Sequence, residues 1–124
     1  MATDADTILT LDDVVAGYGK MTILHGTSFS VQRGTITTVI GPNGAGKSTV
    51  FKAVFGMLPA RSGRVLFEGA EITNLAPRDL LARGISYVPQ GRNIFPELSV
   101  RHNLELGAVM APVGFDLSGR IAAA

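Results

Sequence analysis

The chain has 124 residues, of which 46% are hydrophobic, so it can build the core of one modest domain. Eleven basic and ten acidic residues give a formal net charge of +1, which excludes a strongly basic nucleic-acid or membrane-binding protein. The absence of cysteine excludes disulfides and cysteine-ligated metals. No apolar run approaches the roughly 18 residues of a membrane span, and the acidic N-terminus is no signal peptide. We therefore expect a soluble, intracellular protein.

Strands alternate with short helices in the first part of the chain. A first strand is expected over residues 8–15, ending at the bend Gly17-Tyr18-Gly19, and a second over residues 27–31, with residues 21–25 leading into it. Residues 35–40 are all β-branched and predict a third strand. A helix follows Gly46 and ends by Leu58, because Pro59 disfavours a helical residue before it.

The second part continues the same alternation, so the order of elements indicates an α/β protein. Residues 64–68 predict a strand, and Pro77 introduces a short helix over residues 78–82. Residues 85–88 predict another short strand. Ser99 is a good N-cap for a helix that runs from Val100 to about Val109. The tail from Ala111 is ambiguous, and residues 121–124 have the composition of a helix that is cut short.

One glycine-rich segment matches the phosphate-binding pattern G-x-x-x-x-G-K-[ST] at every fixed position. It comprises Gly41, Pro42, Asn43, Gly44, Ala45, Gly46, Lys47 and Ser48, followed by Thr49. The strand predicted before it and the helix after it are the context that such a loop requires. Lys47 can reach the β- and γ-phosphates, and the Ser48 hydroxyl can ligate Mg²⁺. The segment therefore predicts a nucleoside triphosphate site; the alternative is a turn that only caps a helix.

Three stretches carry a resemblance to a known family, and they cover about residues 9–107: LDDVVAGYGKMTILHGTSFSVQRGTITTVIGPNGAGKST, SGRVLFEGAEIT and ISYVPQGRNIFPELSVRHNLELG. The chain resembles the first half of the ATP-binding subunit of an ABC transporter. It is most similar to the ATPases of branched-chain amino acid importers, with urea and amide importers as close relatives. The phosphate loop is shared by many NTPases, whereas VPQGRNIFPELSV indicates the amino acid subgroup.

The resemblance implies part of one P-loop nucleotide-binding domain of the α/β class, over residues 1–124. About residues 1–98 would form the antiparallel β-subdomain and part of the parallel-sheet core that carries the phosphate loop. About residues 99–124 would begin the helical subdomain. The nucleotide would be ATP, bound with Mg²⁺ between Tyr18 and the Gly41–Thr49 loop.

The same resemblance assigns roles to two further residues. Tyr18 matches the aromatic residue that stacks on adenine; the alternative is a tyrosine that covers the end of a strand. Gln90 matches the glutamine that ligates Mg²⁺ and orients the attacking water; the alternative is a loop glutamine bonded to backbone. Lys47 and Gln90 are thus the catalytic candidates. His25 and His102 are not interpreted as ligands, and His102 is expected to face solvent or a membrane partner.

Several parts that the family uses for hydrolysis are absent from these 124 residues. They are an Asp–Glu pair after a hydrophobic strand, an LSGGQ signature and a later switch histidine. Leu117-Ser118-Gly119-Arg120 only superficially resembles the signature, because it lacks the second glycine and the glutamine. We therefore expect a truncated N-terminal portion, poorly soluble or only partly folded, that hydrolyses no ATP by itself.

In complete form, the resemblance implies an ATPase subunit of an importer, with branched-chain amino acids as the expected cargo. Its partners would be a second ATP-binding subunit in a head-to-tail dimer and transmembrane permease subunits. It would lie in the cytoplasm, at the inner face of the plasma membrane, and reach the membrane only through those partners. The alternatives are a urea or amide importer ATPase and a non-catalytic or regulatory nucleotide-binding module. A nucleic-acid-associated relative is disfavoured by the balanced charge.

Overall fold

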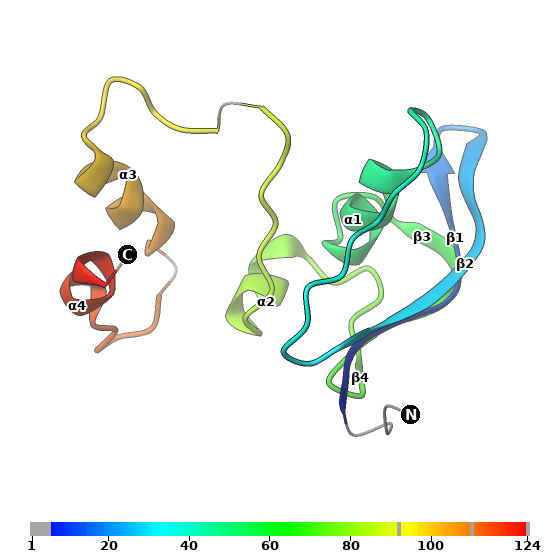
Figure 1. Cartoon of the computed structure of the whole chain (residues 1–124), viewed down its shortest axis with the longest axis horizontal. Coiled ribbons are helices and arrows are strands. Elements are labelled where there is room, and N and C mark those ends of the chain that lie inside the picture. The colour runs from blue at the N-terminus through cyan, green and yellow to red at the C-terminus, as the bar shows by residue number, and fades with distance from the viewer. Residues whose placement is uncertain (1–5, 92, 110, 124) are drawn as a thin grey trace. The chain divides into compact units, whose positions relative to one another are not determined.

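The computed structural model describes residues 6–91, 93–109 and 111–123. The chain divides into two compact units, Met1–Tyr87 and Val88–Ala124. The first unit contains β1 (Thr7–Tyr18), β2 (Met21–Gln32), α1 (Lys47–Val54), β3 (Ala60–Phe67), β4 (Ala70–Glu71) and α2 (Pro77–Ala82) (Figure 1). The second unit contains α3 (Val100–Gly107) and α4 (Leu117–Ala122). None of these helices has the length and apolar character needed to cross a bilayer.

The first unit is built on an antiparallel sheet of four strands in the order β2-β1-β3-β4. β1 and β2 form a hairpin in which Tyr18 pairs with Met21 across the turn. β1 also pairs with β3, so that Leu11 lies opposite Val65. The expected strands in these three regions are confirmed. The second strand is continuous from Met21, the strand at residues 64–68 begins earlier, at Ala60, and β4 was not expected.

One hydrophobic core joins the sheet to α1 and α2. Its largest fully buried side chains are Leu11, Val14, Val65, Ile72 and Leu80. Burial of one such side chain contributes about 1.5–3 kcal/mol of transfer free energy. α1 adds its buried face to the same core, including Val50 and Ala53. The core therefore fixes α1, and with it the glycine-rich loop, against the β1–β2 hairpin.

Two predicted strands are wrong, because residues 35–40 and 85–88 form no strand in the structure. Among the described residues, strands pair only within the sheet of β1, β2, β3 and β4. Ile36 is 98% exposed, Ile40 87% and Val88 88%. Strand propensity reflects how well a side chain packs on a sheet beside neighbouring strands, and among the described residues neither segment has a neighbouring strand. Figure 1 shows the segment between β2 and α1 as an unpaired coil.

The second unit is held together by side chains that bond to backbone. Ser99 caps α3 by accepting from the backbone N–H of His102 at 3.2 Å, which confirms the expected helix start; the helix ends at Gly107. Asn103 accepts from the Phe95 N–H at 2.8 Å and donates to the Phe95 carbonyl at 3.0 Å. Asp116 caps α4, which contains the four residues that superficially resemble a signature.

Candidate functional site

The glycine-rich loop leads directly into α1, and Gly46 is the N-cap of that helix. Gly46 has φ 91°, a left-handed conformation that disfavours a side chain. A Cβ at this position would lie 3.1 Å from Cγ2 of Ile23 and 3.2 Å from Cδ2 of Leu24. Glycine is therefore required both by the backbone conformation and by the close packing of the loop on β2.

Lys47 is the first residue of α1, and its side chain folds back over the loop. Its Nζ donates to the carbonyl of Gly41 at 2.6 Å and to that of Pro42 at 2.7 Å. The ammonium therefore lies at the N-terminal end of α1, where the helix dipole is also positive. No side chain in the described part of the molecule caps this helix start. A lysine and a helix N-terminus beside a glycine loop form an arrangement that attracts phosphate.

The two hydroxyl residues that follow have different environments. Ser48 is exposed in the first turn of α1, whereas Thr49 is buried, with only 6% exposure. Thr49 therefore packs into the core, and the Ser48 hydroxyl is the one that is free to face a ligand. No group of three acidic, histidine or cysteine side chains among the described residues could hold a metal. A Mg²⁺ ion at this loop would be held mainly by phosphate oxygens and water, with the Ser48 hydroxyl as the protein's ligand.

Tyr18 lies at the end of β1 and is 46% exposed. The ammonium of Lys52, on α1, lies 5.6 Å from the centroid of the Tyr18 ring, within the range of a cation–π contact. Lys52 is about one and a half helical turns beyond Lys47. The structure thus brings the Tyr18 ring beside the same helix that begins at the glycine loop.

Gln90 belongs to the second unit and is exposed there. Residues 85–88 before it are not a strand, so the short strand expected just ahead of Gln90 is wrong. The first unit by itself carries the glycine loop and Tyr18. The proposed metal and catalytic role of Gln90 stays a prediction.

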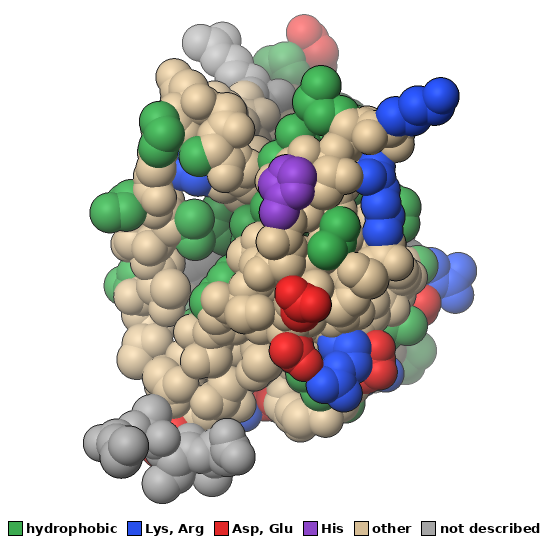
Figure 2. All heavy atoms as spheres, turned by 90° about the vertical axis from the view of Figure 1, so that its right-hand side faces the viewer, with side chains coloured by type: hydrophobic (Ala, Val, Ile, Leu, Met, Phe, Trp, Pro, Cys, Tyr) green, Lys and Arg blue, Asp and Glu red, His purple; other side chains and the backbone are tan. Residues whose placement is uncertain are grey.

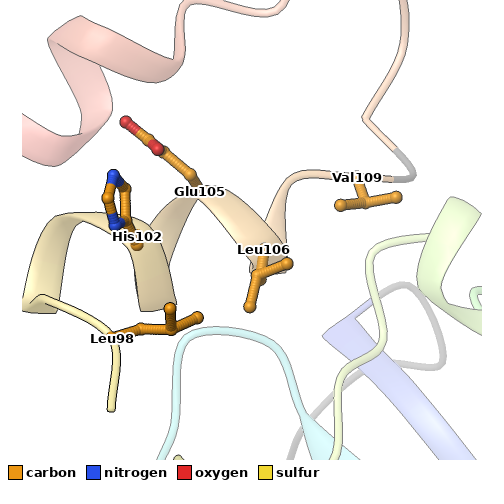
Figure 3. Close-up of a pocket in the computed structure, with 5 residues that line it drawn as sticks. All are labelled: Leu98, His102, Glu105, Leu106 and Val109. Carbon is orange, nitrogen blue, oxygen red and sulfur yellow. The ribbon is translucent and has the colours of Figure 1, made fainter. Parts of the chain in front are cut away.

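The two histidines have different environments. His25 is exposed on β2, opposite Val15. His102 lines a shallow pocket of about 360 Å³ on the second unit, together with Leu98, Glu105, Leu106 and Val109. Figure 3 shows His102 and Glu105 projecting from one side of α3, away from the Leu106 side chain. His102 is exposed, and the expectation that it faces solvent or a membrane partner stays a prediction.

Two ion pairs link charged side chains on the sheet side of the first unit. Arg33 bonds to Glu68, and Arg64 bonds to Asp12 at 2.7 Å. The hydrogen bond from Arg64 to Asp12, and then the Asp12 charge, raise the pKa of the Arg64 guanidinium. On the face drawn in Figure 2, acidic and basic side chains are interspersed. This face offers no extended basic patch of the type that nucleic-acid binding uses.

Two cations beside Tyr18 were not identified from the sequence. One is Lys52, described above, and the other is Arg61 on β3. The Arg61 guanidinium donates to the carbonyl of Gly19 at 2.7 Å and to Oγ1 of Thr22 at 2.9 Å. No motif marks either residue, because both reach Tyr18 and its turn only through the fold.

The sheet, the glycine loop at the start of α1 and the adjacent aromatic ring define a nucleotide-binding protein of the ATP-binding cassette type. Residues 24–123 match the ABC transporter family, and the chain belongs to that family. The resemblance inferred from the sequence is therefore confirmed. Membership of this family implies nucleotide binding.

The curated relatives that match include amino acid and sugar transport proteins. The chain is 43% identical over 93 residues to a probable branched-chain amino acid transport ATP-binding protein, LivF, of Archaeoglobus fulgidus, covering 75% of this chain and 39% of that protein. It is 41% identical over 100 residues to the high-affinity branched-chain amino acid transport ATP-binding protein BraG of Pseudomonas aeruginosa, covering 81% and 43%. A ribose import ATP-binding protein, RbsA, of Shouchella clausii is 37% identical over 100 residues, covering 81% and 20%. The chain thus spans less than half the length of these relatives.

Solved structures show the same fold. An ATP-binding cassette of an ABC transporter in its ADP conformation superposes with a TM-score of 0.77 at 37% identity, covering 94% of this chain and 45% of that one. A nucleotide-free ATP-binding cassette gives a TM-score of 0.70 at 30% identity, covering 94% and 52%. The expected fold class, a partial α/β nucleotide-binding domain with an antiparallel sheet, is confirmed.

Proposed function

We propose that this chain is the nucleotide-binding part of an ABC importer subunit and that it takes ATP with Mg²⁺. The observation that carries the proposal is the position of the Lys47 ammonium over the glycine loop, at the uncapped start of α1. Branched-chain amino acids are the proposed cargo, which the names of LivF and BraG support. Because sugar-import relatives also match, the cargo is selected by the partners rather than by this loop.

In this proposal, the residues of the site share the tasks of binding ATP and positioning its reacting groups. The Gly41–Thr49 loop wraps the phosphates with backbone N–H groups, and Lys47 transfers its hydrogen bonds from the loop carbonyls to the β- and γ-phosphates. Ser48 and Gln90 supply oxygen ligands to Mg²⁺, which neutralises phosphate charge when bound. Gln90 also orients the attacking water. The Tyr18 ring stacks on adenine.

The assembly that we propose follows the family. A second ATP-binding subunit completes the site in a head-to-tail dimer, and transmembrane permease subunits bind the pair at the cytoplasmic face of the membrane. Within the chain, about residues 1–98 supply the β-subdomain and the phosphate loop, and about residues 99–124 begin the helical subdomain.

The direct test of the phosphate site is Lys47→Ala in a titration of the chain with MgATP. A hydrogen bond to a charged group contributes about 1.5–3 kcal/mol, so we expect an affinity at least about tenfold lower. Arg78→Ala is the matched control, since it removes an exposed cation from α2 in the same unit. Equal MgATP affinity for the wild type and Lys47→Ala would contradict the proposed site.

Adenine stacking is tested separately with Tyr18→Ala and Tyr18→Phe. Base–aromatic stacking is worth about 1–3 kcal/mol in nucleic-acid systems, so Tyr18→Ala is expected to weaken ATP binding about fivefold or more. Tyr18→Phe keeps the ring face and is expected to keep the affinity. Inorganic tripolyphosphate has no base, so its affinity should be the same for both variants. If the two variants bind ATP equally, the tyrosine has only a structural role.

A non-catalytic nucleotide-binding module is the second candidate, because the 124 residues contain no adjacent Asp–Glu pair. Phosphoryl transfer needs a group that orients the attacking water as well as charge neutralisation. We therefore expect no steady-state phosphate release from the chain with MgATP beyond that of Lys47→Ala, which reveals any contaminating ATPase. Turnover that Lys47→Ala abolishes would exclude this candidate.

A further inference from the structure

We propose that Arg61 is a positioning residue for the Tyr18 ring and thereby controls affinity for the adenine base but not for the phosphates. The proposal rests on the proposed stacking of Tyr18 on adenine, and the experiment below separates the two.

Arg61 reaches across the sheet to the turn that carries Tyr18. Its Nη2 donates to the carbonyl of Gly19 at 2.7 Å, and its Nη1 donates to Oγ1 of Thr22 at 2.9 Å. The Gly19 carbonyl lies immediately after Tyr18 in the turn, and Thr22 lies on the returning strand β2. Nη2 also donates to the carbonyl of Met21, the first residue of β2, at 3.4 Å. A planar guanidinium that holds two points fixes orientation as well as distance, which a single point charge cannot do.

The β1–β2 ladder runs to the turn, where Tyr18 pairs with Met21, but the β1–β3 ladder ends before it. β3 pairs with β1 as far as Ala16 opposite Ala60, two residues short of Tyr18. The β1–β2 register also shifts between Ala16 and Gly17. Beyond the last β1–β3 pair, the turn is linked to β3 by the Arg61 side chain.

Apolar packing contributes little at this end of the hairpin. Tyr18 is 46% exposed and Met21 65% exposed, so neither side chain is buried in the core. The two backbones lie close together here: a Cβ on Gly17 would lie only 2.0 Å from the Met21 carbonyl oxygen. With so little buried apolar area, a polar clamp has a correspondingly larger effect on where the turn lies.

The ring itself has a second support on α1. Lys52 places its ammonium 5.6 Å from the Tyr18 centroid, over one ring face. A base would stack on the part of the Tyr18 ring that stays open. This requires that the hairpin turn hold the ring against α1. Arg61 holds the backbone of the turn, and Lys52 holds the ring. The phosphate loop is fixed independently, by the packing of Gly46 on Ile23 and Leu24.

The test compares Arg61→Ala with Arg64→Ala in the full chain, using ATP and inorganic tripolyphosphate as probes. Arg64 is the matched control: it lies on the same strand and bonds to Asp12 on β1, but it does not touch the turn. We expect Arg61→Ala to weaken ATP binding about three- to tenfold and tripolyphosphate binding less than about twofold. Arg64→Ala should leave both affinities within about twofold of wild type.

A double-mutant cycle and a fluorescence signal report on the same coupling. In the Tyr18→Ala background, Arg61→Ala should have no further effect on ATP binding, because its action passes through the ring. The chain contains no tryptophan, so Tyr18→Trp introduces a single tryptophan, whose emission can be excited apart from that of the remaining tyrosine. ATP should quench its emission, and Arg61→Ala should reduce the quenching at saturating ATP.

Four results would overturn the proposal. Equal loss of ATP and tripolyphosphate affinity in Arg61→Ala would mean that Arg61 stabilises the whole unit. Additive losses from Arg61→Ala and Tyr18→Ala would mean that the two residues act independently. If Tyr18→Ala alone leaves ATP affinity unchanged, adenine stacking fails and Arg61 positioning fails with it. If Tyr18→Ala weakens ATP binding but Arg61→Ala does not, only the positioning role is lost.

Discussion

The two units of the chain are stabilised in different ways. In the first unit, eleven hydrophobic residues are buried, and they come from the sheet, α1, α2 and the segments between them. Among the described residues of the second unit none is buried, and its two helices are held by caps and by the Asn103 side chain. Apolar burial resists local opening more strongly than exposed hydrogen bonds do. The glycine loop and Tyr18 therefore lie on the more stable unit, whereas Gln90 lies on the less stable one.

The largest expected difference between the units concerns leucine truncation. Leu11 is 2% exposed in the first unit, whereas Leu106 is 44% exposed in the second. Leu11→Ala should lower the free energy of unfolding of the first unit by about 2–5 kcal/mol, since it removes buried apolar side-chain atoms and leaves a cavity. Leu106→Ala should change the free energy of unfolding of the second unit by less than about 0.5 kcal/mol. Urea denaturation followed by circular dichroism measures both, and similar losses would refute the contrast.

A smaller effect is expected at two glycines with the same backbone conformation. Gly46 has φ 91° and Gly114 has φ 88°, but only Gly46 has neighbours that a Cβ would meet, in Ile23 and Leu24. Both alanine variants carry left-handed strain of about 1–2 kcal/mol. Gly46→Ala should lose more unfolding free energy than Gly114→Ala, up to about 3 kcal/mol, and should also lose MgATP affinity. A Gly114→Ala variant that binds MgATP as poorly as Gly46→Ala would contradict this assignment.

How much of the fold could be predicted depended on whether a segment with strand composition finds a strand to pair with in the structure. β1 and β2 were predicted because the hairpin pairs segments adjacent in sequence, and alternation identifies them. Residues 35–40 have stronger strand composition, yet they form no strand, because composition cannot supply a hydrogen-bonded neighbour. The same limit applies to residues 85–88.

In the candidate site, consecutive residues could be predicted from the sequence, whereas contacts between different elements could not. The glycine loop could be predicted because its chemistry depends on consecutive residues, whose spacing the sequence displays. Tyr18 was identified only through the family resemblance. Lys52 and Arg61 could not be predicted, since each reaches Tyr18 or its turn from a different element and contributes a contact that no local pattern encodes. Contacts between distant segments are thus the part of the site that required the structure.

In the second unit, the most important single contact is expected to be the cap of α3. Ser99 Oγ accepts from the His102 N–H at 3.2 Å, which satisfies one of the free amides at the helix start. Ser99→Ala should destabilise α3 by about 1 kcal/mol, and Ser99→Gly by only a few tenths. Hydrogen exchange of the α3 amides in the full chain measures the local opening. If Ser99→Ala slowed or did not change exchange, caps would not be what stabilises this unit.

The smallest effect is expected from the surface ion pair on α3. Arg101 and Glu105 are one turn apart, with 3.9 Å between Nη1 and Oε1, and both side chains are largely exposed. Exposed pairs of this spacing contribute about 0.3–0.5 kcal/mol at best. Here the cation precedes the anion, which is the weaker order, and each charge lies at the end of the helix that its sign disfavours.

We therefore expect Glu105→Gln to leave α3 amide exchange unchanged or slightly slower, with no dependence on salt between low and physiological ionic strength. Loss of the ion pair and relief of the unfavourable dipole interaction nearly cancel. The control is Glu97→Gln, an acidic residue of the same unit that lies outside both of its helices. If Glu105→Gln instead accelerated exchange as much as Ser99→Ala, the Glu105 carboxylate would have a stabilising partner besides Arg101. His102, which projects from the same side of α3, would then be the residue to substitute next.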